Sequence, residues 1–522
     1  MTKLPTFNPL GFSGIGLVGS ARTSALFVRW PSSQYGLMNI RQLDPMSGLP
    51  LPEREKPTAQ DTTDYREVLR AKGSFPTGGE NGWYYCDHGV RELVKGYFAR
   101  SLRNHFEGAA RLDLKHDYLL TNEPDYPSAI GSIEGRGGAY VGVGHMLSYT
   151  YPAWQGAVHA YNIDINTRVP MMAVPLYGAL LAMASDRFEF LSLIYGKSIP
   201  KTEEWAKLID GPADVLVGFL KDLPRDPCFE STVGNAVRMS MSGDEALYGK
   251  SEIADSAMNY IRSFREAIDS DRPSPHSNLH PLWILRAKDR KGRGGTLSSE
   301  EQFRHERDIF IDGRITGVAS PLSGHGLDMI EDNMRAIGTV PRAVYLSNVE
   351  DWFFEDYKKA NRDDPDIDPG EVRRNTYDFY RQLKEFNGRN DVRLISALGC
   401  YPTTVHSLAR YIENAIPLDR AEEDAVASAA KIYNLRYEAS RAMRMPLRGR
   451  VKDLAEALDG EMHVIVSELR RGWRGRPISR GDAESALLDR SHHFRETLTD
   501  WERGAVLRVI EDTGIIARDG DE

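Results

Sequence analysis

Two glycines near residue 140 constrain the fold of this 522-residue chain more than any other feature. Gly142 and Gly144 close a short apolar run within the stretch 138–166, and a second apolar run in that stretch carries Asp164 near its end. A segment long enough for one or two helical turns separates the two runs. This order predicts a strand, a tight glycine turn, a short helix and a second, parallel strand.

The same stretch carries part of a nucleotide-binding pattern. In dinucleotide-binding folds, glycines let the backbone approach the nucleotide, and an acid about 20 residues later binds the ribose hydroxyls. Asp164 follows Gly142 by 22 positions, but Leu147 stands where the third glycine of that pattern would be. A glycine pair with one acid favours the adenosine half of a phosphate-free ligand, of which S-adenosylmethionine is the commonest. The alternative is a buried strand whose glycines only allow close packing.

Length and composition indicate an ordinary soluble protein of two or three domains. Apolar residues make up 41% of the chain and charged residues 27%, with a net charge of −9. The negative charge disfavours nucleic acid or an anionic membrane as a partner, and no run approaches the ~20 apolar residues of a membrane span. Three widely spaced cysteines indicate a reducing compartment or simply buried thiols. We therefore expect a cytoplasmic protein.

The pattern along the chain predicts three regions. Residues 1–115 form an N-terminal extension, partly irregular because it is rich in proline, glycine and charge. Residues 116–415 form an α/β domain of Rossmann-like type, with a mostly parallel sheet and a helical insertion at about 200–297. Residues 416–522 form a C-terminal helical region.

Periodicity places the remaining elements of the central domain. Further strands are expected over 315–319, 343–349 and 392–398. Helices are expected over 176–194 and 405–415 and, in the C-terminal region, over 483–509.

The strand expected over 343–349 ends in polar residues, Ser347 and Asn348. Open α/β sheets bind ligands at the carboxyl ends of their strands, so these two side chains are candidates for the site. The alternative is a strand-to-helix turn that either residue caps.

Four further polar residues are candidates to orient or deprotonate an acceptor. They are Asn122, Glu123, Tyr149 and Glu350. No metal-ligand spacing accompanies them, and no metal is expected.

Four motifs resemble a group of uncharacterised bacterial proteins that are regarded as having a methyltransferase-like Rossmann fold. The motifs are DYLLTNE (117–123), GAYVGVG (138–144), NIDI (162–165) and LSNVE (346–350). The resemblance spans roughly residues 117–398. The chain departs from the group at two places. Leu147 and Ser148 stand where relatives tend to carry glutamine and asparagine, and Ser320 stands where they tend to carry an aspartate.

The resemblance implies a S-adenosylmethionine-dependent transferase, most simply a methyltransferase with an unknown small-molecule or protein acceptor. Gly142 and Gly144 would admit the cofactor and Asp164 would bind its ribose, while Ser347 and Asn348 would face its methionine part or the acceptor. Transfer of the aminocarboxypropyl group of the same cofactor is an alternative reaction.

Two other classes stay open. The first is a non-catalytic nucleoside-binding or regulatory protein that keeps the fold, which the two departures favour. The second is a NAD-dependent oxidoreductase, which the missing third glycine disfavours.

Overall fold

The computed structural model describes most of the chain after residue 120. With short gaps, the described residues are 28–29, 120–233, 258–268, 281–442 and 478–512. The expected N-terminal extension, apart from the two-residue strand β1 (Val28–Arg29), lies outside them. So do Asn122, the three cysteines and part of the expected helical insertion.

The chain divides into two compact units, Met1–Tyr345 and Leu346–Glu522. In the first unit the strand order is β1-β4-β3-β2-β5. Strands β2, β3, β4 and β5 run parallel to one another, and β1 is antiparallel to β4. The four parallel strands are β2 (Ala139–Gly142), β3 (His159–Asp164), β4 (Ile315–Ala319) and β5 (Pro341–Ser347). The expected strands are confirmed, and the unit is an α/β structure with a mostly parallel sheet.

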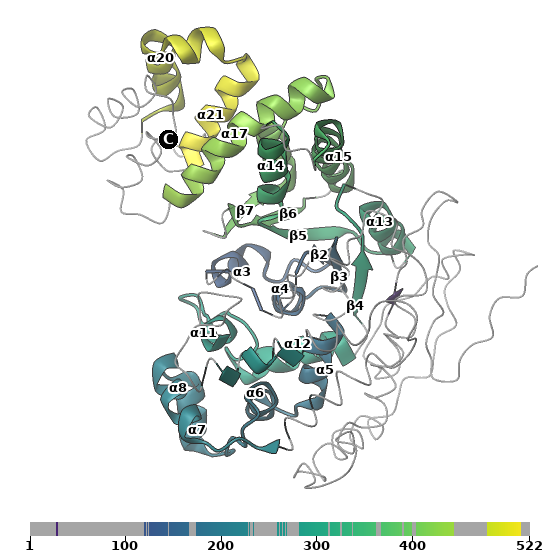
Figure 1. Cartoon of the computed structure of the whole chain (residues 1–522), viewed down its shortest axis with the longest axis vertical. Coiled ribbons are helices and arrows are strands. Elements are labelled where there is room, and N and C mark those ends of the chain that lie inside the picture. The colour runs from purple at the N-terminus through teal and green to yellow at the C-terminus, as the bar shows by residue number, and fades with distance from the viewer. Residues whose placement is uncertain are drawn as a thin grey trace, which may run out of the picture. The chain divides into compact units, whose positions relative to one another are not determined.

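Figure 1 shows the helices of this unit. They are α3 (Pro127–Ile133), α4 (Leu147–Gln155), α5 (Val174–Met183), α6 (Arg187–Tyr195), α7 (Glu203–Asp210), α8 (Ala213–Asp222), α11 (Pro281–Arg286), α12 (Glu300–Ile311) and α13 (Gly326–Ala336). Helix α4 connects β2 to β3 and packs against both strands and against α12, which also packs against α5. All of β2 and nearly all of β3 is buried, as expected for parallel strands covered on both faces.

The single helix expected over 176–194 is two helices. Helix α5 ends at Met183, and α6 begins at Arg187 after a break. Asp186 is the N-cap of α6, and its carboxylate accepts a hydrogen bond from the backbone N–H of Glu189 at 2.9 Å. This cap ends one helix and begins the next inside an apolar stretch that hides the boundary.

The second unit combines a β-hairpin with helices. Strand β6 (Arg393–Ser396) pairs antiparallel with β7 (Thr404–Ser407). The helices are α14 (Val349–Ala360), α15 (Pro369–Asn387), α16 (Leu408–Ala415), α17 (Glu422–Ala442), α20 (Arg480–Arg490), the short π-helical turn η4 (His493–Thr497) and α21 (Asp500–Asp512). Two expectations were wrong: the first residues of the helix expected over 405–415 form β7, and the helix expected over 483–509 is divided at η4.

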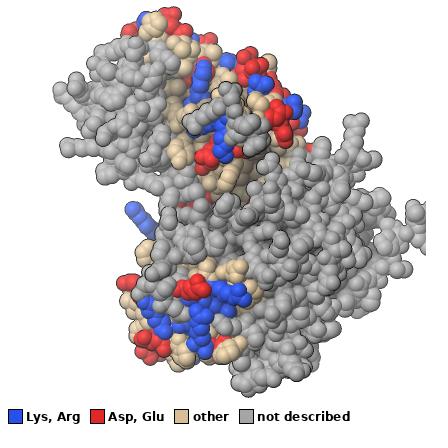
Figure 2. Space-filling model, viewed as in Figure 1, with Lys and Arg blue, Asp and Glu red and all other residues tan. Residues whose placement is uncertain are grey.

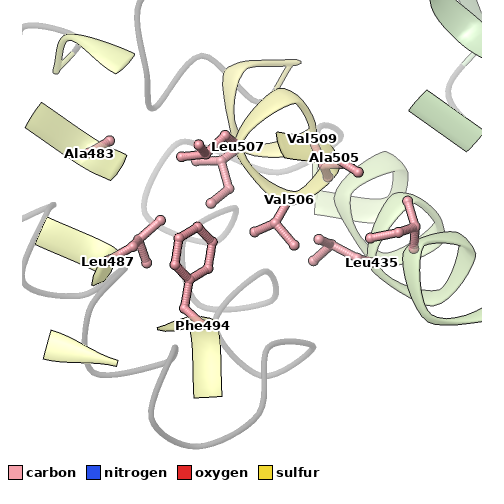
Figure 3. Packing of buried hydrophobic residues seen from close by; sticks show 10 residues of the cluster. Leu435, Ala483, Leu487, Phe494, Ala505, Val506, Leu507 and Val509 are labelled. Carbon is pink, nitrogen blue, oxygen red and sulfur yellow. The ribbon is translucent and has the colours of Figure 1, made fainter. Parts of the chain in front are cut away.

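Apolar side chains of α17, α20, η4 and α21 form one buried cluster in the second unit (Figure 3). Its members include Leu435, Leu487, Phe494, Val506 and Leu507. Helix α17 also packs against α14, α15 and α16. Helix α17, which follows the boundary expected near residue 416, therefore packs against helices that precede this boundary in the chain. No helix among the described residues is long and apolar enough to cross a membrane.

Candidate functional site

Gly144 and Asp164 meet at the carboxyl ends of β2 and β3. The Gly144 N–H donates to Oδ2 of Asp164 at 3.4 Å. Gly144 has a φ of 80°, a left-handed conformation that favours glycine. Asn162 holds this turn from β3, because its Nδ2 donates to the Gly144 carbonyl and, at 2.9 Å, to Oγ of Ser148. The Ser320 N–H donates to the Asp164 carbonyl at 3.1 Å. The structure thus brings together the glycine turn and Asp164, as their spacing in the sequence predicts.

Residue 142 is glycine for a different structural reason. A Cβ atom at this position would collide with the phenol end of Tyr140, which lies two residues earlier on the same face of β2. Glycine at 142 therefore leaves room for the Tyr140 hydroxyl at the end of the strand. This is the close-packing interpretation for Gly142, whereas the turn itself depends on Gly144.

Glu123 lies in a buried group of tyrosines. Its Oε2 accepts a hydrogen bond from the Tyr345 hydroxyl at 2.9 Å, and its side chain is fully buried. The Tyr151 ring lies 5.4 Å from that of Tyr345 and 6.2 Å from that of Tyr140. Burial, and then the charge of Glu123, raise the pKa of Tyr140 well above its usual range. Sequence reasoning selected Glu123 but missed the tyrosines around it, which resemble ordinary core residues in the sequence.

Tyr149 is packed between helices. It is fully buried on α4, and its ring centroid lies 5.5 Å from that of Tyr177 on α5. Its hydroxyl lies close to Gly178 of α5. These contacts give Tyr149 a packing role in the interface between α4 and α5.

A second buried carboxylate, Glu306 on α12, was not expected from the sequence. It accepts hydrogen bonds from the Thr150 hydroxyl at 2.8 Å, the Thr296 hydroxyl at 2.5 Å and the Gln302 amide at 2.8 Å. Tyr177 and Thr296 share a further hydroxyl–hydroxyl hydrogen bond. Burial raises the pKa of Glu306 to about 7, and the three donors only partly offset this effect. No local motif marks this site, because its donors lie on different segments.

Ser347 and Asn348 belong to the second unit. Ser347 has a φ of 52°, and it is the only described residue other than glycine with a positive φ. Such strain in a non-glycine residue is typical of functional positions. Asn348 is at the N-cap position of α14, yet its side chain makes no capping hydrogen bond. The side-chain capping alternative is therefore wrong for Asn348.

Glu350 is held in a buried ion pair in the second unit. Arg436 donates to both of its carboxylate oxygens, at 2.9 and 3.1 Å, and the Tyr380 hydroxyl donates to Oε1. Burial by itself lowers the pKa of Arg436, but the Glu350 charge more than offsets this and holds it above its usual range. The Arg436 guanidinium also lies 4.4 Å from the centre of the Tyr411 ring. Glu350 thus has the contacts of a structural residue.

Lys and Arg side chains gather on a part of the first unit where α7 and α8 lie, with acidic side chains among them (Figure 2). Arg187 and Lys288 both face Asp210, at 2.7 and 4.0 Å, and Lys207 pairs with Glu203 at 2.9 Å. The local acids therefore offset these positive charges.

Within the part of the chain that the structure describes, no three His, Cys, Asp or Glu side chains converge in a way that could hold a metal ion. No curated protein matches the chain. Residues 118–210, which contain β2, α4, β3 and the Gly144–Asp164 contact, match the model of a family described as a domain of unknown function (DUF7790).

Proposed function

We propose that the first unit is a Rossmann-like domain that binds the adenosine part of S-adenosylmethionine. The contact between the Gly144 N–H and the Asp164 carboxylate, at the carboxyl ends of neighbouring parallel strands, is the observation that carries this proposal. The contact holds the carboxylate beside the glycine turn. A nucleoside ribose there would donate its hydroxyls to Asp164 while its body lies against backbone that has no side chain.

The strand order supports the same location. From β2 the chain continues to β3 and then β4 on one side, and it later returns to β5 on the other side of β2. Ligands of open α/β sheets bind where the strand order reverses in this way, at the carboxyl ends of the strands. Here that point is between β2 and β5, directly beside the glycine turn.

Methyl transfer is the simplest reaction for such a ligand. The methyl group leaves a sulfonium, so the protein mainly has to hold the acceptor in line with the bond that breaks. The assignment of Ser347 and Asn348 to the methionine part or the acceptor stays a prediction from the sequence; the left-handed φ of Ser347 supports a functional role for that residue. The acceptor is an unknown small molecule or protein. We also propose a cytoplasmic location, on the basis of net charge and cysteine usage.

A non-catalytic nucleoside-binding or regulatory protein is the second candidate. Two of the three described candidates for acid–base chemistry have structural contacts: Glu350 is paired with Arg436, and Tyr149 packs against α5. This leaves Glu123 as the remaining acid–base candidate that the sequence suggested. Binding without turnover would fit this arrangement.

Calorimetry on the full chain with S-adenosylmethionine, S-adenosylhomocysteine and NAD tests the proposal. We expect the first two to bind and Asp164→Ala to weaken them about 10- to 100-fold, because hydrogen bonds to a partly buried charge are lost. Asp332→Ala, which removes a likewise part-buried acid of α13 that pairs with Arg335 at 3.0 Å, is the matched control and should bind as the wild type does. Equal affinity in Asp164→Ala and the wild type would contradict the assignment of Asp164 to the ribose. Binding of NAD alone would favour the oxidoreductase.

Transfer of label separates the enzyme from the binding protein. The chain is incubated with methyl-labelled S-adenosylmethionine and a cell extract, and label is followed into small molecules and proteins. Wild-type transfer that Asp164→Ala abolishes supports the transferase. Cofactor binding without transfer to either fraction supports the non-catalytic alternative.

A further inference from the structure

A buried polar group lies at the carboxyl end of β2, directly beside the proposed nucleoside site. Gly142 is in register with Tyr345 on the parallel strand β5. The Tyr345 hydroxyl donates to Glu123 at 2.9 Å. The phenol end of Tyr140 reaches the same strand end, next to the Cα of Gly142. Glu123 and Tyr140 are both fully buried.

The Tyr140 hydroxyl makes no hydrogen bond in the structure. A buried donor without an acceptor costs free energy, and natural proteins leave few such groups. The space for this hydroxyl exists only because residue 142 is glycine. An unpartnered buried donor whose electrostatic neighbour is a buried carboxylate indicates that an external group completes the arrangement.

The two groups have complementary chemistry. The Glu123 carboxylate accepts hydrogen bonds and attracts a cation, while the Tyr140 hydroxyl can donate to an anion. An α-amino acid end carries one ammonium and one carboxylate on the same carbon. Burial would strengthen both interactions, because the local dielectric constant is low.

We propose that Glu123 and Tyr140 bind the amino-acid end of the nucleoside ligand, the ammonium donating to Glu123 and Tyr140 donating to the ligand carboxylate. Tyr345 is a positioning residue that holds the Glu123 carboxylate. This inference rests on the proposed function, because it assigns the second half of the same ligand. It makes the ligand class specific: an adenosine thioether or sulfonium with a zwitterionic tail.

Two ligands that differ only in that tail test the inference. S-adenosylhomocysteine has the amino-acid end, and 5′-methylthioadenosine lacks it. Glu123→Gln should weaken S-adenosylhomocysteine about 10- to 100-fold, by loss of a charged hydrogen bond, and leave 5′-methylthioadenosine unchanged. Each variant is measured by calorimetry with both ligands, so that a general effect on folding changes both affinities and is recognised.

Tyr140→Phe is the second variant, and we expect it to fold as the wild type does. It removes a buried oxygen that has no partner, so its melting temperature should equal or exceed that of the wild type. Its affinity for S-adenosylhomocysteine should nevertheless fall about tenfold, with no change for 5′-methylthioadenosine. A variant that is more stable but binds the zwitterionic ligand more weakly is the signature of a binding residue.

The chain offers a matched control for each variant. Tyr195 on α6 also has a fully buried hydroxyl without a partner, and Glu306 is a fully buried carboxylate that accepts three hydrogen bonds. Tyr195→Phe and Glu306→Gln should leave both affinities unchanged.

The outcomes separate the two proposals. If the wild type binds both ligands and neither Glu123→Gln nor Tyr140→Phe changes the ratio of their affinities, the amino-acid subsite is wrong and the nucleoside site stands. If the wild type binds neither ligand, the proposed function fails and the subsite fails with it. Equal weakening of both ligands in Glu123→Gln also overturns the subsite, because it assigns Glu123 a purely structural role.

Discussion

At the scale of single residues, Glu306 is a buried carboxylate whose charge should change near neutral pH. Burial raises its pKa from an ordinary 4.5 to about 7. The folded protein therefore holds the proton more tightly than the unfolded chain, and protonation stabilises the fold. This contribution is complete below about pH 4.5 and is lost as the pH rises through about 7, and it amounts to on the order of 3 kcal/mol.

Glu306→Gln should remove that pH dependence while keeping the network, since the amide still accepts from Thr150 and Gln302 and can donate to Thr296. Urea unfolding between pH 5 and 8 measures it. The difference in unfolding free energy between wild type and variant should change by roughly 1.4 kcal/mol per pH unit below pH 7. Glu301→Gln, which removes an exposed carboxylate from the same helix, should follow the wild type. Parallel pH profiles of wild type and Glu306→Gln would contradict the assignment.

At the scale of elements, two helical glycines should respond to alanine with opposite signs. Gly178 lies where α5 meets the Phe310 ring of α12 and the Tyr149 hydroxyl of α4, so an added methyl group would collide with both. Gly178→Ala should destabilise the protein by about 1–3 kcal/mol. Gly218 on α8 has open space around its Cα, so Gly218→Ala should stabilise it by about 0.5–1 kcal/mol. Chemical denaturation measures both, and equal shifts would show that helix propensity, not packing, governs position 178.

The elements also show where sequence reasoning succeeds. Strand β4 was expected at its observed bounds, because a run of five residues rich in β-branched side chains and bounded by turn residues favours a strand. The break between α5 and α6 was missed because the Asp186 cap lies inside a long apolar stretch. The contact between Gly144 and Asp164 follows from a local βαβ unit, whose spacing is visible in the sequence. Glu123 and Tyr345 are 222 residues apart, so no local pattern could reveal that they share a hydrogen bond.

At the scale of the whole molecule, the second unit should not survive removal of its C-terminal half. A chain that ends at Ala415 lacks α17 and with it Arg436, the partner of the buried Glu350. It also loses Tyr433, whose ring stacks on Phe354 with 4.4 Å between centroids. An unpaired buried charge alone costs about 3–5 kcal/mol. We expect rapid hydrogen exchange in α14, α15 and α16 of the truncated chain.

Full-length variants isolate the ion pair from the lost packing. Arg436→Met should destabilise the second unit by about 3–5 kcal/mol, and adding Glu350→Gln should restore most of this loss, since the buried charge is then gone. If the truncated chain instead keeps protected amides in α14, α15 and α16, residues after 416 are a separable region.

The position of β5 beside β2 has a consequence for synthesis. Strands β2 and β3 are close in the chain and can pair early, but the other edge of β2 pairs only with β5, about 200 residues later. At about 5–20 residues per second, translation takes roughly 10–40 s to cover that distance. Throughout this interval β2 is an open edge that another nascent chain can pair with. Protection by chaperones should therefore matter more for this protein than for one whose neighbouring strands are made in succession.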